Sequence, residues 1–194
     1  MSVLQQQTQQ LTVFSAISDM ETPLSLFSKL SETEDTAFLL ESMPDKTRLA
    51  RFSFIGFSPL QTVAFKSGKA TVFTPADGQS SEMAIDNPLT YMEEAMKTHF
   101  HSVSPEVRQR YQFPFLGGWV GYMGYAGIQY FEEIPLQAND PLDIPDGIYG
   151  LYDTFVCFDH AERRISLASY REPEQVKLLW DELKRVIAKP SSLS

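Results

Sequence analysis

A carboxylate and a hydroxyl, Glu41 and Ser42, directly follow the apolar run AFLL at 37–40, and Arg51 opens the next apolar run. A strand that ends in Glu-Ser places polar groups at the mouth of a core, where they need hydrogen-bond partners. Glu41 can hold an ammonium group, Ser42 can exchange a hydrogen bond, and Arg51 can offer paired donors to a carboxylate. The three residues therefore suit a small zwitterion. A capped turn with an internal Glu41–Arg51 pair explains the same pattern, and the residues alone favour it.

The other chemistry-bearing residues do not combine into a site. The histidines, His99, His101 and His160, lack the spacing of zinc ligands, so we predict no metal. Cys157 is the only cysteine and lies in an apolar run, which indicates a packed side chain rather than a nucleophile. The segment GGWVGYMG at 117–124 has neither a GK[ST] ending nor GxGxxG spacing before a helix, so close packing in a sheet explains its glycines better.

Composition narrows the class of protein. With 43% apolar residues in 194, the chain can bury a sizeable core, and we expect a soluble globular domain. A net charge of −9 without a Lys/Arg cluster argues against nucleic acid and anionic membranes as partners. A single cysteine, no signal peptide and no apolar run of membrane-spanning length predict a cytoplasmic location.

Hydrophobic periodicity predicts the elements around these residues. Strands are expected at 37–40, 51–55, 60–66, 70–74, 113–125, 147–158 and 164–170, with a hairpin turn at Ser67-Gly68. Helices are expected after Pro23 and at 88–99, 126–133 and 172–187, and surface connections at 101–112 and 135–145. This mixture predicts an α+β fold, a largely antiparallel sheet with helices packed on it. We expect a flexible leader at 1–12, one domain at 13–188 and a linker at 189–194.

Several motifs occur in an order that resembles the N-terminal region of anthranilate synthase component I, a family of chorismate-utilising enzymes. They are LLES, RFSFIGFSP, FLGGWVGYMGY, YFEEIP and DPLDIPDGIYGLYDTFVCFDH. The resemblance extends from about Phe14 to Ile187 and implies the fold of that enzyme's N-terminal domain.

The resemblance also implies a function. The family is a lyase of tryptophan biosynthesis that converts chorismate and ammonia to anthranilate and pyruvate. A glutamine amidotransferase subunit delivers the ammonia, and L-tryptophan inhibits the enzyme by allosteric feedback. Ser42 is the residue most firmly carried over to the L-tryptophan site; Glu41 belongs to the same motif, and Arg51 stands where related chains have a basic residue.

The resemblance further implies that the chorismate and Mg²⁺ ligands lie in a C-terminal domain that this chain does not include. We therefore expect no catalytic residue and no cofactor here, and no activity of this part alone. An apolar face that normally packs on that domain is expected to be exposed and to favour self-association.

Two positions depart from the family pattern. Ala126 and Gln129 replace an Asp and an Arg, which puts in doubt their contacts with the missing domain. Two alternatives stay open: component I of aminodeoxychorismate synthase from folate synthesis, and a free-standing amino-acid-binding module. LLES with RFSFIG favours anthranilate synthase over the folate enzyme, and calorimetry with L-tryptophan would separate a self-sufficient module from half a site.

Overall fold

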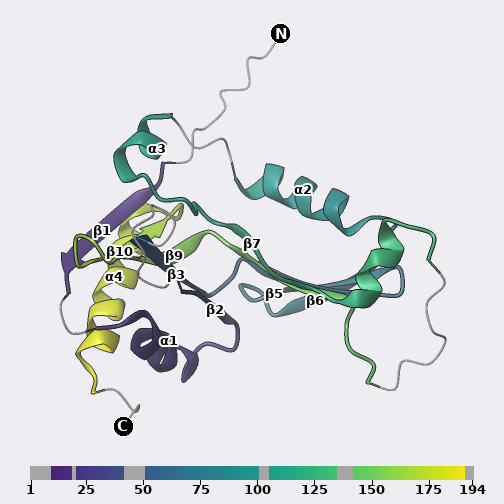
Figure 1. Ribbon diagram of the computed structural model, residues 1–194, viewed down its shortest axis with the longest axis horizontal. Helices are drawn as coiled ribbons and strands as arrows, with labels where there is room; N and C mark the ends of the chain where they lie inside the picture. Colours follow the sequence, from purple (N-terminus) through teal and green to yellow (C-terminus); the bar gives the residue numbers. More distant parts are fainter. Residues whose placement is uncertain (1–9, 19–20, 42–50, 101–104, 135–141, 191–194) are drawn as a thin grey trace. The chain divides into compact units, whose positions relative to one another are not determined.

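The computed structural model describes residues 10–18, 21–41, 51–100, 105–134 and 142–190 (Figure 1). The chain divides into two compact units, which we call the first unit (1–59, 100–117 and 152–194) and the second unit (60–99 and 118–151). Each unit is built on a five-stranded sheet, and the strand pairings that define the registers are antiparallel. The predicted α+β class is confirmed, although the described residues form two sheets rather than one.

The sheet of the first unit has the strand order β1-β10-β9-β3-β2. Its strands are β1 (Thr12–Ile17), β2 (Ala37–Leu40), β3 (Phe52–Phe57), β9 (Thr154–Asp159) and β10 (Arg164–Ser169). Every residue of β3 and β9 is buried, because these strands lie inside the sheet with both faces covered. Leu11 is buried and Thr12 pairs with Ser169, so the described end of the expected leader belongs to this sheet.

Two helices, α1 (Pro23–Ser31) and α4 (Pro173–Ala188), cover one face of this sheet (Figure 1). The apolar stripe predicted for α4 is confirmed at Val176, Trp180 and Leu183, which are buried in the core between the helices and the sheet. The opposite face packs against α3 (Pro105–Tyr111) and the aromatic segment that follows it. The surface connection predicted at 101–112 contains the helix α3, none of whose residues is buried.

The sheet of the second unit has the order β6-β5-β4-β8-β7. Its strands are β4 (Gln61–Lys66), β5 (Lys69–Thr74), β6 (Gln79–Ala84), β7 (Gly118–Met123) and β8 (Gly147–Tyr152). The predicted hairpin at Ser67-Gly68 is confirmed, with φ of 48° and 76° at the two turn residues. The helix α2 (Pro88–His99) packs its apolar side on this sheet, and the segment expected to be a helix at 126–133 is a 3-10 helix, η2 (Tyr125–Tyr130).

The prediction of one strand at 147–158 was wrong. The run breaks at Asp153, and its halves enter different sheets as β8 and β9. Asp153 is buried because Arg171 Nε donates to both of its carboxylate oxygens, at 3.2 and 3.0 Å, and Thr154 Oγ1 donates at 2.9 Å. An aspartate whose oxygens are all hydrogen-bonded thus interrupts the strand. The sequence has no glycine or proline at this position that would have indicated the break.

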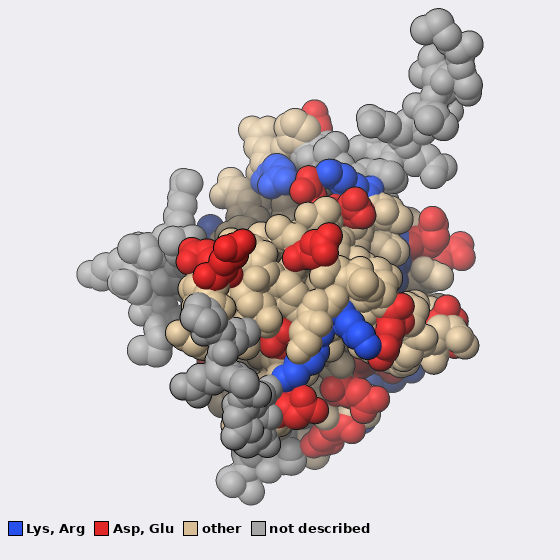
Figure 2. All heavy atoms as spheres, turned by 90° about the vertical axis from the view of Figure 1, so that its right-hand side faces the viewer, with Lys and Arg blue, Asp and Glu red and all other residues tan. Residues whose placement is uncertain are grey.

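Gly121 of β7 serves close packing, as predicted for the glycines of this segment. A Cβ at Gly121 would lie 2.0 Å from the carbonyl oxygen of Ile148 in the neighbouring strand, so only glycine fits there. Acidic and basic side chains are interspersed on the face drawn in Figure 2, and no basic stripe crosses it. None of the helices in the described ranges has the length and apolar character that crossing a membrane requires.

Candidate functional site

One end of each of the five strands of the first unit's sheet lies along the same edge, which runs across the strand ends. Because neighbouring strands run antiparallel, the carboxyl ends of β1, β9 and β2 meet the amino ends of β10 and β3 there. Glu41 follows β2 and Arg51 precedes β3, so the structure places both of these predicted residues at this edge. Ser42, the third predicted residue, lies outside the described residues.

A cavity of about 390 Å³ opens at this edge, and we call it the strand-end cavity. Its volume falls within the range of small-molecule sites, about 300–1,000 Å³. Its lining includes a set of charged or titratable residues: Glu21, Glu41, Asp159, His160, Arg163 and Arg164. Apolar surface is supplied by Pro23, Phe158 and Ile165. Every lining residue belongs to the first unit.

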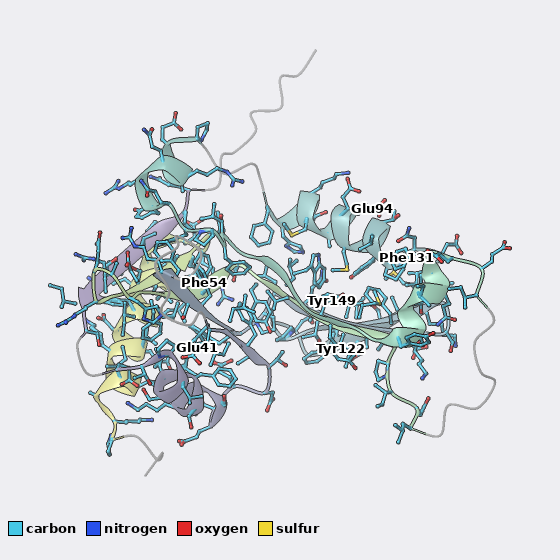
Figure 3. All side chains as sticks on the ribbon, in the orientation of Figure 1. Glu41, Phe54, Glu94, Tyr122, Phe131 and Tyr149 are labelled. Carbon is cyan, nitrogen blue, oxygen red and sulfur yellow. The ribbon has the colours of Figure 1, made fainter. Side chains whose placement is uncertain are left out.

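Strand register explains why Glu41 lines this cavity. Leu39 pairs with Ile55 and packs in the core under α1 and α4. Side chains alternate along a strand, so Glu41 points to the same face as Leu39. Figure 3 shows Glu41 on the side of the sheet where α1 lies. Phe158 and Ile165 pair with each other and belong to the same core, which makes this face of the sheet the floor of the cavity.

Two of the three acidic residues in the lining are engaged by cations. Glu21 accepts a hydrogen bond from Lys29 Nζ at 2.7 Å, in an ion pair whose side chains are each 7% exposed. Asp159 is held by Arg51. Glu41 is exposed, and none of the described residues gives it a hydrogen bond or an ion pair. It is therefore the acidic group of the lining that can accept a ligand's proton donor.

Arg51 binds neither a position open to a ligand carboxylate nor Glu41, the two partners considered from the sequence. Its Nε donates to Asp159 Oδ1 at 2.8 Å, and its Nη2 donates to Asp159 Oδ2 and to Glu162 Oε1. The internal pair that the sequence suggested between Glu41 and Arg51 is therefore not formed. Arg51 is also absent from the residues that line the strand-end cavity. Whether Glu41, Ser42 and Arg51 bind L-tryptophan remains a prediction.

The Arg51–Asp159 pair perturbs the acidity of both groups. The hydrogen bond to Asp159 raises the pKa of Arg51, against a smaller opposing effect of burial. Burial by itself would raise the pKa of Asp159, but hydrogen bonds from Arg51 and from the backbone N–H groups of Glu162 and Ala161 outweigh it, so this pKa is lowered. Both groups are consequently charged at neutral pH, and the pair ties β3 to the turn after β9.

His160 contributes to the cavity in a way that the sequence did not indicate. It lies directly after β9 and is exposed, and its Nε2 lies 2.8 Å from the hydroxyl oxygen of Ser53. Its ring stacks on Phe158 with an interplanar angle of 21°. Glu21, His160 and Arg163 could not be found from local patterns, because tertiary pairing alone brings them to the cavity.

Other candidates are accounted for by packing. Burial raises the pKa of the Cys157 thiol, as expected for a core side chain. Gln129 Nε2 donates to Asp146 Oδ2 at 3.1 Å and to the carbonyl of Ala126 at 2.9 Å, so this departure from the family pattern supports a contact within the second unit. Among the described residues, no group of three or more His, Cys, Asp or Glu side chains is placed to hold a metal ion.

Comparison with known proteins identifies relatives. The model of the chorismate binding enzyme family matches residues 35–193. Anthranilate synthase component 1 of Streptomyces coelicolor is 32% identical over 81% of this chain and 26% of that protein. The protein of the same name from Thermus thermophilus is 32% identical over 86% of this chain and 34% of its own length.

A solved structure of a protein with the same name is also similar to this chain. The crystal structure of anthranilate synthase component I from Streptococcus pneumoniae TIGR4 matches with a TM-score of 0.57 and 26% identity, over 79% of this chain and 32% of that chain. The chain thus spans about a third or less of the proteins that it resembles.

Proposed function

Because the chain belongs to the family of chorismate binding enzymes, we propose that it is the N-terminal part of anthranilate synthase component I. The whole enzyme, a lyase, would convert chorismate and ammonia to anthranilate and pyruvate in tryptophan biosynthesis. A glutamine amidotransferase subunit would supply the ammonia. The chorismate and Mg²⁺ ligands would lie in a C-terminal domain outside these residues, and the protein would act in the cytoplasm.

The proposed contribution of this part is the L-tryptophan feedback site, located at the strand-end cavity. One observation carries the proposal: Glu41 reaches the cavity with a carboxylate that no described residue engages, beside an apolar floor of Phe158 and Ile165. An amino acid with an apolar side chain combines an ammonium group with surface that gains free energy by burial. Both requirements are met by this lining. Ser42 would add a hydrogen bond from the position next to Glu41.

Inhibition at such a site would follow from linkage between two conformations. L-tryptophan lowers activity only to the extent that it binds the inactive conformation more tightly than the active one. Couplings of this kind are typically about 1–3 kcal/mol, or about 5- to 150-fold in affinity.

An uncovered sheet face in the second unit supports the proposal of a partner domain. Tyr149 lies on the face under α2, together with its neighbour Val63, whereas Tyr122 points away from α2 (Figure 3). On the same side as Tyr122, register places Phe73 and Ile148, and these three side chains are 37% to 44% exposed. Within the second unit, the apolar contacts of α2 and η2 are made with the cluster of Val63 and Tyr149 on the other face. We propose that it packs on the C-terminal domain and favours self-association when that domain is absent.

The test is anthranilate formation by the protein as its gene encodes it, followed by fluorescence with chorismate, ammonium and Mg²⁺ supplied. We expect turnover that L-tryptophan inhibits, and no turnover by residues 1–194 alone. Ser42→Phe should relieve inhibition by filling the pocket while the turnover number stays unchanged. Production of aminodeoxychorismate instead of anthranilate would favour the folate enzyme, and turnover by residues 1–194 alone would refute the assignment of catalysis to another domain.

A further inference from the structure

A zwitterion in the strand-end cavity needs a cation as well as Glu41, and Arg51 is not available for that role. Its guanidinium is engaged by Asp159 and Glu162, and it does not line the cavity. We propose that Arg163 binds the carboxylate of the amino acid while Glu41 binds its ammonium group. This inference rests on the proposed function, because it assumes that an α-amino acid occupies the cavity.

Two adjacent arginines, Arg163 and Arg164, line the cavity, and their contacts favour Arg163 as the ligand. Arg163 lies in the turn directly before β10 and lines the cavity together with Ile165 of the floor. Arg164 pairs with Ile17 and Asp159, which places its side chain on the opposite face of the sheet. Arg164 also lines the cavity, but it is engaged in an ion pair, with its Nε 3.4 Å from Glu162 Oε2.

The turn that carries Arg163 is fixed by Asp159. Oδ1 of Asp159 accepts from the backbone N–H groups of Ala161 at 3.0 Å and Glu162 at 3.1 Å, in addition to Arg51. Arg163 closes the turn in the left-handed conformation, with φ of 50°. Arg51 is thus a positioning residue, which holds the turn so that Arg163 stands at the wall of the cavity.

The arrangement predicts which ligands are selected. A guanidinium presents five N–H donors and can bind a carboxylate through two of them, even when it also keeps a protein contact. Glu41 leaves β2 and Arg163 precedes β10, and β9 and β3 lie between those strands in the sheet. The two opposite charges therefore approach the cavity from different sides. A ligand that carries both an ammonium and a carboxylate can bind both side chains, whereas an amine or an acid alone can bind only one of them.

The test compares three probes on the protein as its gene encodes it: L-tryptophan, tryptamine, which lacks the carboxylate, and indole-3-propionate, which lacks the ammonium. Calorimetric affinities and inhibition of anthranilate formation are measured for wild type, Arg163→Gln and Arg163→Lys. We expect Arg163→Gln to weaken L-tryptophan by about tenfold or more and to leave tryptamine within about twofold of wild type. Arg163→Lys should recover part of the loss, because it keeps the charge without the planar fork.

Two further variants complete the comparison. Glu41→Gln should weaken L-tryptophan and tryptamine and leave indole-3-propionate unchanged. Arg185→Gln, which removes the same charge from an exposed position of α4, should leave all three affinities at wild-type values.

The outcomes separate the inference from the function on which it rests. Wild-type protein that neither binds L-tryptophan nor is inhibited by it would refute the feedback site itself. If wild type binds L-tryptophan but Arg163→Gln binds it equally well, Arg163 is not the carboxylate ligand and the feedback site still stands. An equal loss of L-tryptophan and tryptamine in Arg163→Gln would show a structural effect and would also overturn the inference.

Discussion

Replacing Asp159 by Asn should destabilise the first unit by removing the charge that holds Arg51. The asparagine oxygen can still accept from the backbone of the turn, but its amide nitrogen would face Arg51 Nη2, donor against donor. A hydrogen bond to a charged group contributes about 1.5–3 kcal/mol. The Arg51 side chain is 32% exposed and Glu162 remains as a partner, so we expect a loss of about 1–2 kcal/mol.

The loss should appear as a lower midpoint of thermal or urea unfolding. For a chain of this size, 1 kcal/mol corresponds to about 2–4 °C in Tm, so the expected decrease is about 2–8 °C. Asp181→Asn is the matched control, because it removes the same charge from a solvent-exposed i,i+3 pair with Lys184. That variant should unfold at the same midpoint as wild type.

The stability difference between wild type and Asp159→Asn should depend on pH in a defined direction. The pKa of Asp159 is lowered in the folded protein, whereas an aspartate in the unfolded chain titrates near about 3.9. The stability that its charge contributes is therefore complete above that pH and is lost as the pH falls through the folded pKa. The difference between wild type and Asp159→Asn should be large at pH 7 and should narrow towards pH 3. A difference that stays constant over this range, or no difference at pH 7, would refute the reasoning.

Three further predictions concern the first unit. Arg171→Gln removes the cation from buried Asp153 and should lower the free energy of unfolding by about 3 kcal/mol, measured by urea titration. Gly56→Ala would place a Cβ 2.0 Å from Cε1 of the packed Phe38 ring and should cost about 1–3 kcal/mol by the same assay. Cys157 is buried with a raised pKa, so a thiol reagent should modify it far more slowly in native protein than in urea.

Each of these has a contrary result. Unfolding of Arg171→Gln at the wild-type midpoint would mean that the pair with Asp153 does not stabilise the fold. Equal stability of Gly56→Ala would mean that Phe38 moves aside without loss. Rapid modification of Cys157 at neutral pH in native protein would contradict its burial.

The elements that could be predicted from the sequence are those with a strong local signal. The helices α2 and α4 begin at or next to a proline and carry apolar residues at helical spacing, and the hairpin of β4 and β5 has a Ser-Gly turn. The strand β6 was missed because all of its residues are exposed, so it has no alternation to detect. The boundary between β8 and β9 was also missed. Asp153 is stabilised there by Arg171, 18 positions away, and no glycine or proline marks the break in the sequence.

The candidate site shows the same limit more sharply. Glu41 and Arg51 lie at the same end of the sheet because they flank successive strands that pair. The partner of Arg51 is 108 positions away in the chain, and only the pairing of β3 with β9 brings it close. Arg163 and His160 reach the cavity through the same pairing. A pattern in the sequence near Glu41 could not have indicated them.

The most direct test of the account is a crystal structure of the protein, as its gene encodes it, grown with L-tryptophan. We predict the amino acid in the strand-end cavity, with its ammonium group at Glu41 and its carboxylate at Arg163. L-tryptophan bound elsewhere, with this cavity empty of it at saturating concentration, would contradict the account.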